Sequence, residues 1–167
     1  ATPCRYPVLK RAFLFSCLTG LRKSDIQKLT WGEVQKFGKY TRIVFKQRKT
    51  KGQEYLDISS QAEKYLGERG NPDDIVFTGF TYGSWTSLEL QRWSLAAGVN
   101  KNLTFHCARH TFATTLCLSQ GIPLSTVSKM LGHKQITTTQ IYAQTTPIMI
   151  EDAIDRVESR LGGKFAV

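Results

Sequence analysis

The sequence predicts a mainly α-helical domain with one small β-hairpin or three-stranded sheet, which is an α+β fold. Apolar residues near the start follow helical spacing, the pattern changes to period two over residues 41–59, and helical patterns return from residue 60 onward. The chain has 167 residues, without a repeat, a low-complexity segment or a Pro- and Gly-rich linker. We therefore expect a single domain over residues 1–167 with a sizeable core.

The first helix is expected over residues 6–20, where Val8, Phe13, Leu14 and Cys17 have helical spacing. Gly20 is expected to end it, because glycine adopts the left-handed conformation that follows many helices. A second helix is expected over residues 22–31, with Ile26 and Leu29 facing inward.

Residues 41–59 alternate in the manner of strands. Ile43 and Phe45 share one face of the first run, and Tyr55, Leu56 and Ile58 belong to the second. The sequence KTKG lies between the two runs, so we expect a β-hairpin with a glycine-containing turn.

Helices are expected over most of the remaining chain. Ser60 is the expected N-cap of the next helix and Thr104 that of a longer one, which runs to about Gln120 and ends at Gly121. Pro123 lies near the first turn of a short helix. The segment KQITTTQIYAQ is ambiguous because it is rich in β-branched residues, and we interpret it as a short helix. The expected ranges are 60–70, 84–99, 104–120, 122–133, 134–144 and 146–161.

The charge balance favours a polyanionic partner. Lysine and arginine number 23 against 13 acidic residues, a formal net charge of +10, and an excess of this size on a small domain is typical of proteins that bind polyanions. A basic protein without such a partner remains the alternative. No run of 18 apolar residues occurs, so no membrane partner is expected.

The cysteines predict a reducing compartment. No pair has C-x-x-C spacing, and Cys107 and Cys117 lie in helical patterns as small core residues. We expect no disulfides and a cytoplasmic protein. The missing initiator Met leads us to expect a fragment of a longer chain.

His106, Arg109 and His110 cluster within two turns of the helix that follows Thr104. At about 100° per residue all three lie along one broad face. Zinc binding is disfavoured, because Cys107 follows His106 where a metalloprotease helix has glutamate. The alternative to a functional site is a polar helix face without a chemical role.

Arg22, a hairpin lysine and Tyr142 join this cluster as candidates, together with His133. The set consists of hydrogen-bond donors and one phenol, without a carboxylate pair or a glycine-rich phosphate loop, so it is poorly suited to Mg²⁺. Two guanidiniums and imidazoles would stabilise the charge of a phosphodiester transition state. Tyr142 would then be the nucleophile. These residue types predict phosphoryl transfer that needs no metal.

Four segments, taken in order and spacing, resemble the motifs of the tyrosine recombinases, the integrase family of phages and transposons. In this sequence Tyr142 lies nine residues after His133, as the family pattern requires. The resemblance extends through almost the whole chain and implies the catalytic-domain fold of that family. The segments are LTGLRKSD (Leu18 to Asp25), RKTKG (Arg48 to Gly52), HCARHTFATTL (His106 to Leu116) and LGHKQITTTQIYA (Leu131 to Ala143).

The resemblance implies a role for each candidate. Arg22 and Arg109 would bind the nonbridging oxygens of the scissile phosphate, and His133 would be a third phosphate ligand. His106 would act as a hydrogen-bond donor or base near the nucleophile. Tyr142 would attack and leave a 3′-phosphotyrosyl DNA with a free 5′-hydroxyl. Rejoining would then need neither ATP nor a metal, so no cofactor is expected.

Lys49 would protonate the departing 5′-oxygen. It precedes Thr50 as the lysine of the family's Lys-Thr pair does, whereas Lys46 and Lys51 do not. Lys51 stays the alternative general acid. Asp25 and His110 are expected to support the site: Asp25 by accepting from a guanidinium or a backbone amide, and His110 through a buried hydrogen bond.

The implied activity is site-specific DNA recombination. A type IB topoisomerase and a non-catalytic DNA-binding module are the alternatives. The family's N-terminal DNA-clamping domain is absent from residues 1–167. We expect a tetramer on DNA and a monomer for the isolated chain. The expected C-terminal helix has an apolar stripe of Ile148, Ile150, Ile154 and Val157, which would dock on a neighbouring protomer or fold back on its own domain.

Overall fold

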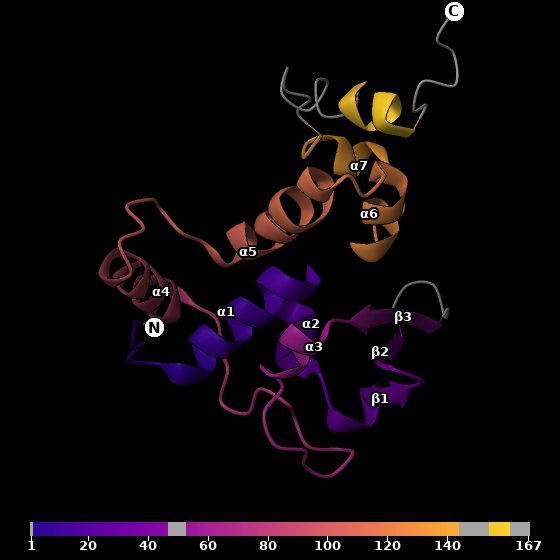
Figure 1. The fold of residues 1–167 in the computed structure, drawn as a ribbon. Helices are drawn as coiled ribbons and strands as arrows, with labels where there is room; N and C mark the ends of the chain where they lie inside the picture. Colours follow the sequence, from indigo (N-terminus) through magenta and orange to yellow (C-terminus); the bar gives the residue numbers. More distant parts are fainter. Residues whose placement is uncertain (1, 47–52, 144–153, 161–167) are drawn as a thin grey trace, which may run out of the picture.

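The structure is a computed structural model that describes residues 2–46, 53–143 and 154–160. Helix α1 lies at the centre, with the sheet on one side, α4 on another, and α5 to α7 grouped together above it (Figure 1). The α-helices are α1 (Pro7–Thr19), α2 (Lys23–Lys28), α3 (Ser60–Glu63), α4 (Ser84–Ala96), α5 (Phe105–Thr111), α6 (Leu124–Met130) and α7 (Thr137–Gln140). The strands are β1 (Val34–Phe37), β2 (Tyr40–Lys46) and β3 (Gln53–Ile58).

The central helix α1 begins and ends as its sequence predicts. Pro7 occupies the first turn, where its missing N–H costs nothing, and Gly20 ends the helix with a φ of 71°. A Cβ added at Gly20 would lie 2.5 Å from Cδ1 of Phe112. Gly20 therefore both turns the chain and lets it approach the helix that follows Thr104, a contact that positions Arg22.

The predicted hairpin is confirmed, and a third strand extends it. β1, β2 and β3 form an antiparallel sheet in that order. Ile43 is paired with Val34 on one side and with Leu56 on the other, and all three are buried. One face of the sheet therefore covers the core. The expected turn, with Lys49 and Lys51, lies outside the described residues.

Two expectations about the helices need correction. The N-cap before α3 is Ser59, whose hydroxyl accepts from the Ala62 N–H at 3.2 Å, and not Ser60. The helix expected over residues 104–120 is α-helical only to Thr111, and then continues as a π-helical segment, Phe112–Cys117, and a short 3₁₀ turn. Gly121 ends it with a φ of 76°, as predicted.

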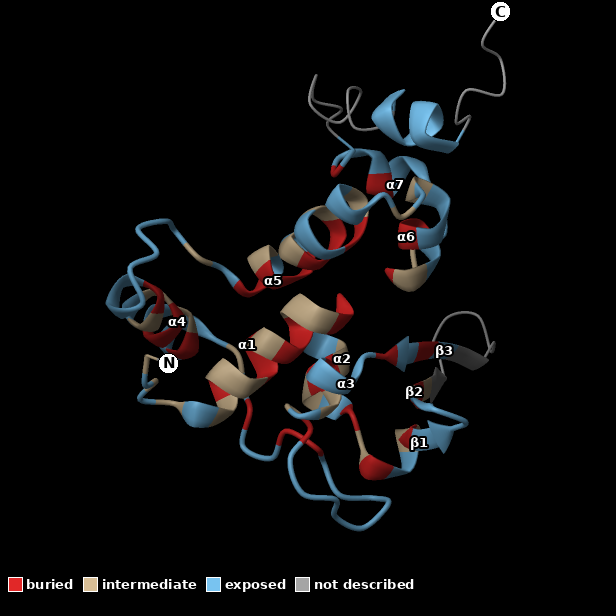
Figure 2. Cartoon of the chain, viewed as in Figure 1, coloured by how far each residue is buried: buried red, intermediate tan, exposed pale blue. Residues whose placement is uncertain are grey.

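The described side chains form two hydrophobic clusters. Figure 2 shows buried residues on the facing surfaces of α1 and α5. The larger cluster contains Phe13 and Phe15 of α1 and Phe105 of α5. The second cluster joins the π-helical segment to α6 and to the chain after α7, and its members are Phe112, Ala113, Cys117, Val127, Leu131 and Tyr142. This cluster determines where Tyr142 lies.

The predicted short helix in the β-branched segment is confirmed as α7. Residues 154–160 are helical, and both Ile154 and Val157 are exposed. Ile148 and Ile150 lie outside the described residues. Within the ranges described, no helix is long and apolar enough to cross a membrane.

Candidate functional site

Five of the six predicted catalytic side chains line one pocket of about 430 Å³. Arg22 comes from the start of α2, His106 and Arg109 from α5, His133 from the turn after α6, and Tyr142 from the turn after α7. The sixth, Lys49, falls outside the described ranges. Residues separated by up to 120 positions therefore meet at one site. A stripe of polar side chains on a single helix would not explain this convergence.

Arg109 is held at the bottom of this pocket by backbone carbonyls. Its Nη1 donates to the Gly20 carbonyl, and its Nη2 donates to the Leu131 carbonyl at 2.5 Å. The residue is only 5% exposed. These bonds connect α5 to the end of α1 and to the end of α6, so the guanidinium has one fixed orientation.

His133 is held between Arg109 and Thr139. Its Nε2 lies 2.9 Å from Nη2 of Arg109, and its Nδ1 lies 2.8 Å from Oγ1 of Thr139, a fully buried residue. A guanidinium can only donate, so Nε2 accepts and Nδ1 carries the proton that it donates to Thr139. This network specifies one neutral tautomer of His133.

The electrostatics of the pocket favour an anion. The pKa of Arg109 is lowered to about 10, chiefly by burial and then by the positive charge of Arg22, while Tyr142 and Asp25 act in the opposite direction. Burial also lowers the pKa of His133, and the charges of Arg109 and Arg22 add to that effect. In the described part of the chain neither arginine forms an ion pair with a carboxylate. A phosphate would offset this repulsion.

Arg22 and His106 are exposed side chains at the rim of the pocket. Arg22 is the N-cap of α2, and its carbonyl accepts from the N–H groups of Asp25 and Ile26 at 2.9 and 3.0 Å. The Asp25 carboxylate lies 3.8 Å from Nζ of Lys28. Asp25 therefore acts on Arg109 only through its charge.

Tyr142 is 6% exposed and packs in the second hydrophobic cluster, while still lining the pocket. The ring of His110 meets it edge to face, with centroids 5.2 Å apart. His110 is itself exposed, so the buried hydrogen bond expected for it is wrong. Its Nδ1 lies 3.5 Å from Oγ1 of Thr114 in an exposed contact, and its ring packs against that of Tyr142.

Sequence reasoning missed several residues that line the pocket. Lys23 follows Arg22 and Thr104 lies two residues before His106, whereas Tyr82 comes from the loop before α4 and belongs to none of the four motif segments. Only folding brings Tyr82 there. The contact of Thr139 with His133 was also missed, because its segment was ambiguous in the sequence.

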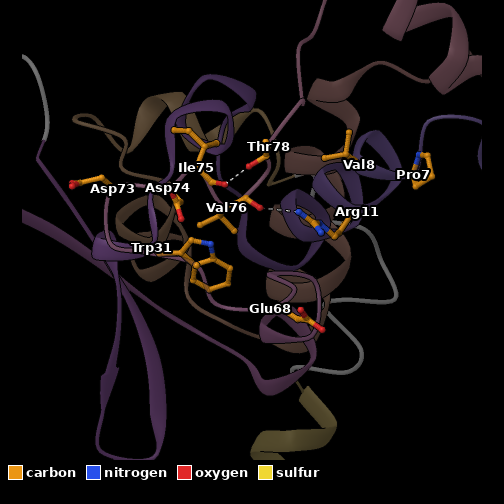
Figure 3. A pocket seen from close by; sticks show the side chains of 11 residues that line it. Pro7, Val8, Arg11, Trp31, Glu68, Asp73, Asp74, Ile75, Val76 and Thr78 are labelled. Atoms are coloured by element: carbon orange, nitrogen blue, oxygen red, sulfur yellow. Dashed lines mark hydrogen bonds between the residues drawn. The ribbon is translucent and has the colours of Figure 1, made fainter.

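A second cavity of about 960 Å³ lies beside the start of α1 (Figure 3). Glu68, Asp73 and Asp74 line it, and Arg11 donates from Nη2 to the Val76 carbonyl at 2.8 Å. Its carboxylates disfavour a polyanion, and none of the five predicted catalytic residues that the structure describes lines it. Over the described ranges, no group of three metal-ligating side chains is found.

The sequence matches a protein family over most of its length and has curated relatives. The Phage integrase family model matches residues 3–147. Tyrosine recombinase XerD of Oceanobacillus iheyensis is 34% identical over 148 residues, which cover 80% of this chain and 49% of that protein. XerD of Listeria innocua is 33% identical over 159 residues, which cover 85% and 52%. The chain thus spans about half the length of these relatives.

Solved structures share the fold. XerA recombinase has a TM-score of 0.66 at 21% identity, covering 90% of this chain and 61% of that one. The catalytic domain of bacteriophage HP1 integrase has a TM-score of 0.62 at 24% identity, covering 91% and 83%. The expected catalytic-domain fold is therefore confirmed. Because the family match extends over most of the sequence, we conclude that this chain belongs to the phage integrase family.

Proposed function

We propose that this chain is the catalytic part of a site-specific DNA recombinase that breaks and rejoins strands through a 3′-phosphotyrosyl intermediate. The observation that carries the proposal is the convergence of two guanidiniums, two imidazoles and a phenol on one pocket. The relatives are named tyrosine recombinases, and XerH, a structural neighbour, was solved bound to its difH substrate in a post-cleavage complex. Double-stranded DNA suits the net charge of +10.

In this mechanism Arg22 and Arg109 bind the nonbridging oxygens of the scissile phosphate. Arg109 is already oriented by two carbonyls, so little reorganisation accompanies the reaction. The phosphate also raises the pKa of His133, because its negative charge opposes those of the arginines. A protonated His133 then donates from Nε2 to the phosphate while Nδ1 keeps its bond to Thr139.

Tyr142 is the nucleophile of the cleavage step. Its oxygen forms a bond to phosphorus as the bond between phosphorus and the 5′-oxygen breaks. His106 accepts the phenolic proton, and Lys49 gives a proton to the departing 5′-oxygen. In the reverse step a 5′-hydroxyl attacks the phosphotyrosine, and the protons return. One phosphodiester is exchanged for another, so the step needs no metal, ATP or other cofactor.

The proposed partners are duplex DNA and, on that DNA, further copies of the chain in a tetramer. The isolated chain is proposed to be a monomer. Both states can be read from the mass of the chain with and without DNA by light scattering.

A nicked suicide duplex tests the chemistry. After cleavage near the nick the short 5′-hydroxyl strand diffuses away, so the covalent complex accumulates. A pool of nicked duplexes with randomised sequence avoids the need to know the target. We expect a band on a denaturing gel with the unaltered chain and none with Tyr142→Phe. DNA binding without any covalent band would support a non-catalytic module instead.

A second assay separates recombination from relaxation. Strand exchange between two duplexes carrying the selected site is expected, whereas a topoisomerase would relax a supercoiled plasmid that lacks the site.

A further inference from the structure

The proposed catalytic pocket extends past the scissile phosphate toward Lys23 and Tyr82. We infer that Lys23, held over the ring of Tyr82, binds the phosphate that adjoins the scissile one on the cleaved strand. This inference rests on the proposed function and adds a second phosphate subsite to it.

Lys23 is placed for such a contact. It follows Arg22 in the chain, and both side chains line the same pocket. Its ammonium is exposed and lies 4.6 Å from the ring centroid of Tyr82. In the described part of the chain no carboxylate pairs with it. The positive charge is therefore available to a ligand.

Tyr82 holds this ammonium from a fixed position. Its hydroxyl accepts from the Phe105 N–H at 3.2 Å, and its ring meets the Phe105 ring edge to face at 5.4 Å. The ring is thus anchored to the first turn of α5, the helix that carries His106 and Arg109. An aromatic face attracts a cation without neutralising it, so Tyr82 orients Lys23 and leaves its charge free.

A phosphate is the ligand that this end of the pocket fits. Its described lining contains Lys23 and Thr104, together with His106. Among the described residues, no carboxylate lines the pocket. A DNA strand carries one phosphate at each nucleotide step. A strand with one phosphate bound at Arg22 therefore places the next phosphate near a neighbouring cation.

Salt dependence of binding tests whether Lys23 contacts a phosphate. In the Tyr142→Phe background, affinity for a duplex of random sequence is measured from low to high salt. Lys23→Gln should reduce the slope of log affinity against log salt by about 0.9, the value for one phosphate contact. Lys39→Gln is the matched control, because Lys39 also lies over a tyrosine ring, 5.1 Å from Tyr40, but outside the pocket. An unchanged slope for Lys23→Gln overturns the inference.

A neutral phosphate tests which one Lys23 contacts. Once the nicked duplex has shown the cleavage position, a methylphosphonate replaces the adjoining phosphate. We expect covalent complex formation to slow about tenfold in the unaltered chain and less than twofold in Lys23→Gln. Equal slowing in both proteins contradicts the assignment. If Lys23→Gln reduces the salt slope as expected but the unaltered chain forms no covalent product, the proposed function is wrong and the phosphate contact of Lys23 stands. Failure of the inference and failure of the proposed function are therefore distinguishable.

Discussion

Arg109 donates to the carbonyl of Gly20, two residues before Arg22. The second arginine of the site is therefore bound to the segment that carries the first. This bond brings α5 and the end of α1 together, and a phosphate between the two guanidiniums would complete the arrangement.

Arg109→Lys should reduce covalent complex formation by about 10²–10³, the usual cost of removing one preorganised donor from a transition state. A lysine has one nitrogen, whereas Arg109 uses two to reach Gly20 and Leu131. Loss of a charged hydrogen bond should also lower the free energy of unfolding by about 1.5–3 kcal/mol. Single-turnover cleavage and urea unfolding measure the two effects.

The control for this substitution is Arg5→Lys, because Arg5 is exposed and forms no ion pair within the described part of the chain. Equal cleavage rates for Arg109→Lys and the unaltered chain would show that Arg109 does not bind the reacting phosphate.

Thr139→Val should slow cleavage by about five- to thirtyfold, which corresponds to the 1–2 kcal/mol of one buried hydrogen bond. The substitution keeps the shape of the side chain but removes the acceptor for Nδ1 of His133. His133 is then free to change tautomer or rotate. Single-turnover rates measure the loss. Thr137→Val, at an exposed neighbour outside the pocket, should have no such effect.

His133 should make the protein less stable as the pH falls below about 6.5. Its pKa is lowered from 6.5 in the folded chain by burial and by the two arginines. The unfolded chain then binds a proton that the folded chain does not, so stability is full above about 6.5 and falls between that pH and the lower folded value. The slope cannot exceed about 1.4 kcal/mol per pH unit.

Thermal unfolding at pH 7.5 and at pH 5.5 measures this effect. His133→Gln should reduce the loss of Tm between the two values, whereas His106→Gln, at an exposed histidine, serves as the control. The same loss of Tm in His133→Gln and the unaltered chain would contradict the assigned cause.

Gly20→Ala should destabilise the fold by more than about 2 kcal/mol. The left-handed conformation alone costs about 1–2 kcal/mol for a non-glycine residue, and the new Cβ would lie 2.5 Å from Cδ1 of Phe112. Gly79→Ala is the matched control, because its φ is +81° and nothing lies within 4 Å of its Cβ position. Urea unfolding should therefore show a smaller loss at Gly79, and equal losses would exclude the close contact as the cause.

The local elements follow directly from the sequence. The helical spacing before Gly20, the alternation at Ile43 and Leu56, and the glycine at Gly121 all predict structures that are confirmed. Nearest neighbours in the chain determine these features, because caps, turns and periodicity act over a few residues. The motif residues likewise predict which side chains meet in the pocket. The family motifs indicate residues that come together after folding, which spacing along the chain does not indicate.

The tertiary structure decided the rest. Burial of Tyr142, exposure of His110 and the change from α- to π-helix at Phe112 depend on how the second hydrophobic cluster packs. Tyr82 reaches the pocket, and Thr139 reaches His133, only because helices distant in sequence pack together. Each of these positions is the outcome of competition between burial and hydrogen bonding across the whole fold. No pattern along the chain specifies that competition, so only the folded structure shows it.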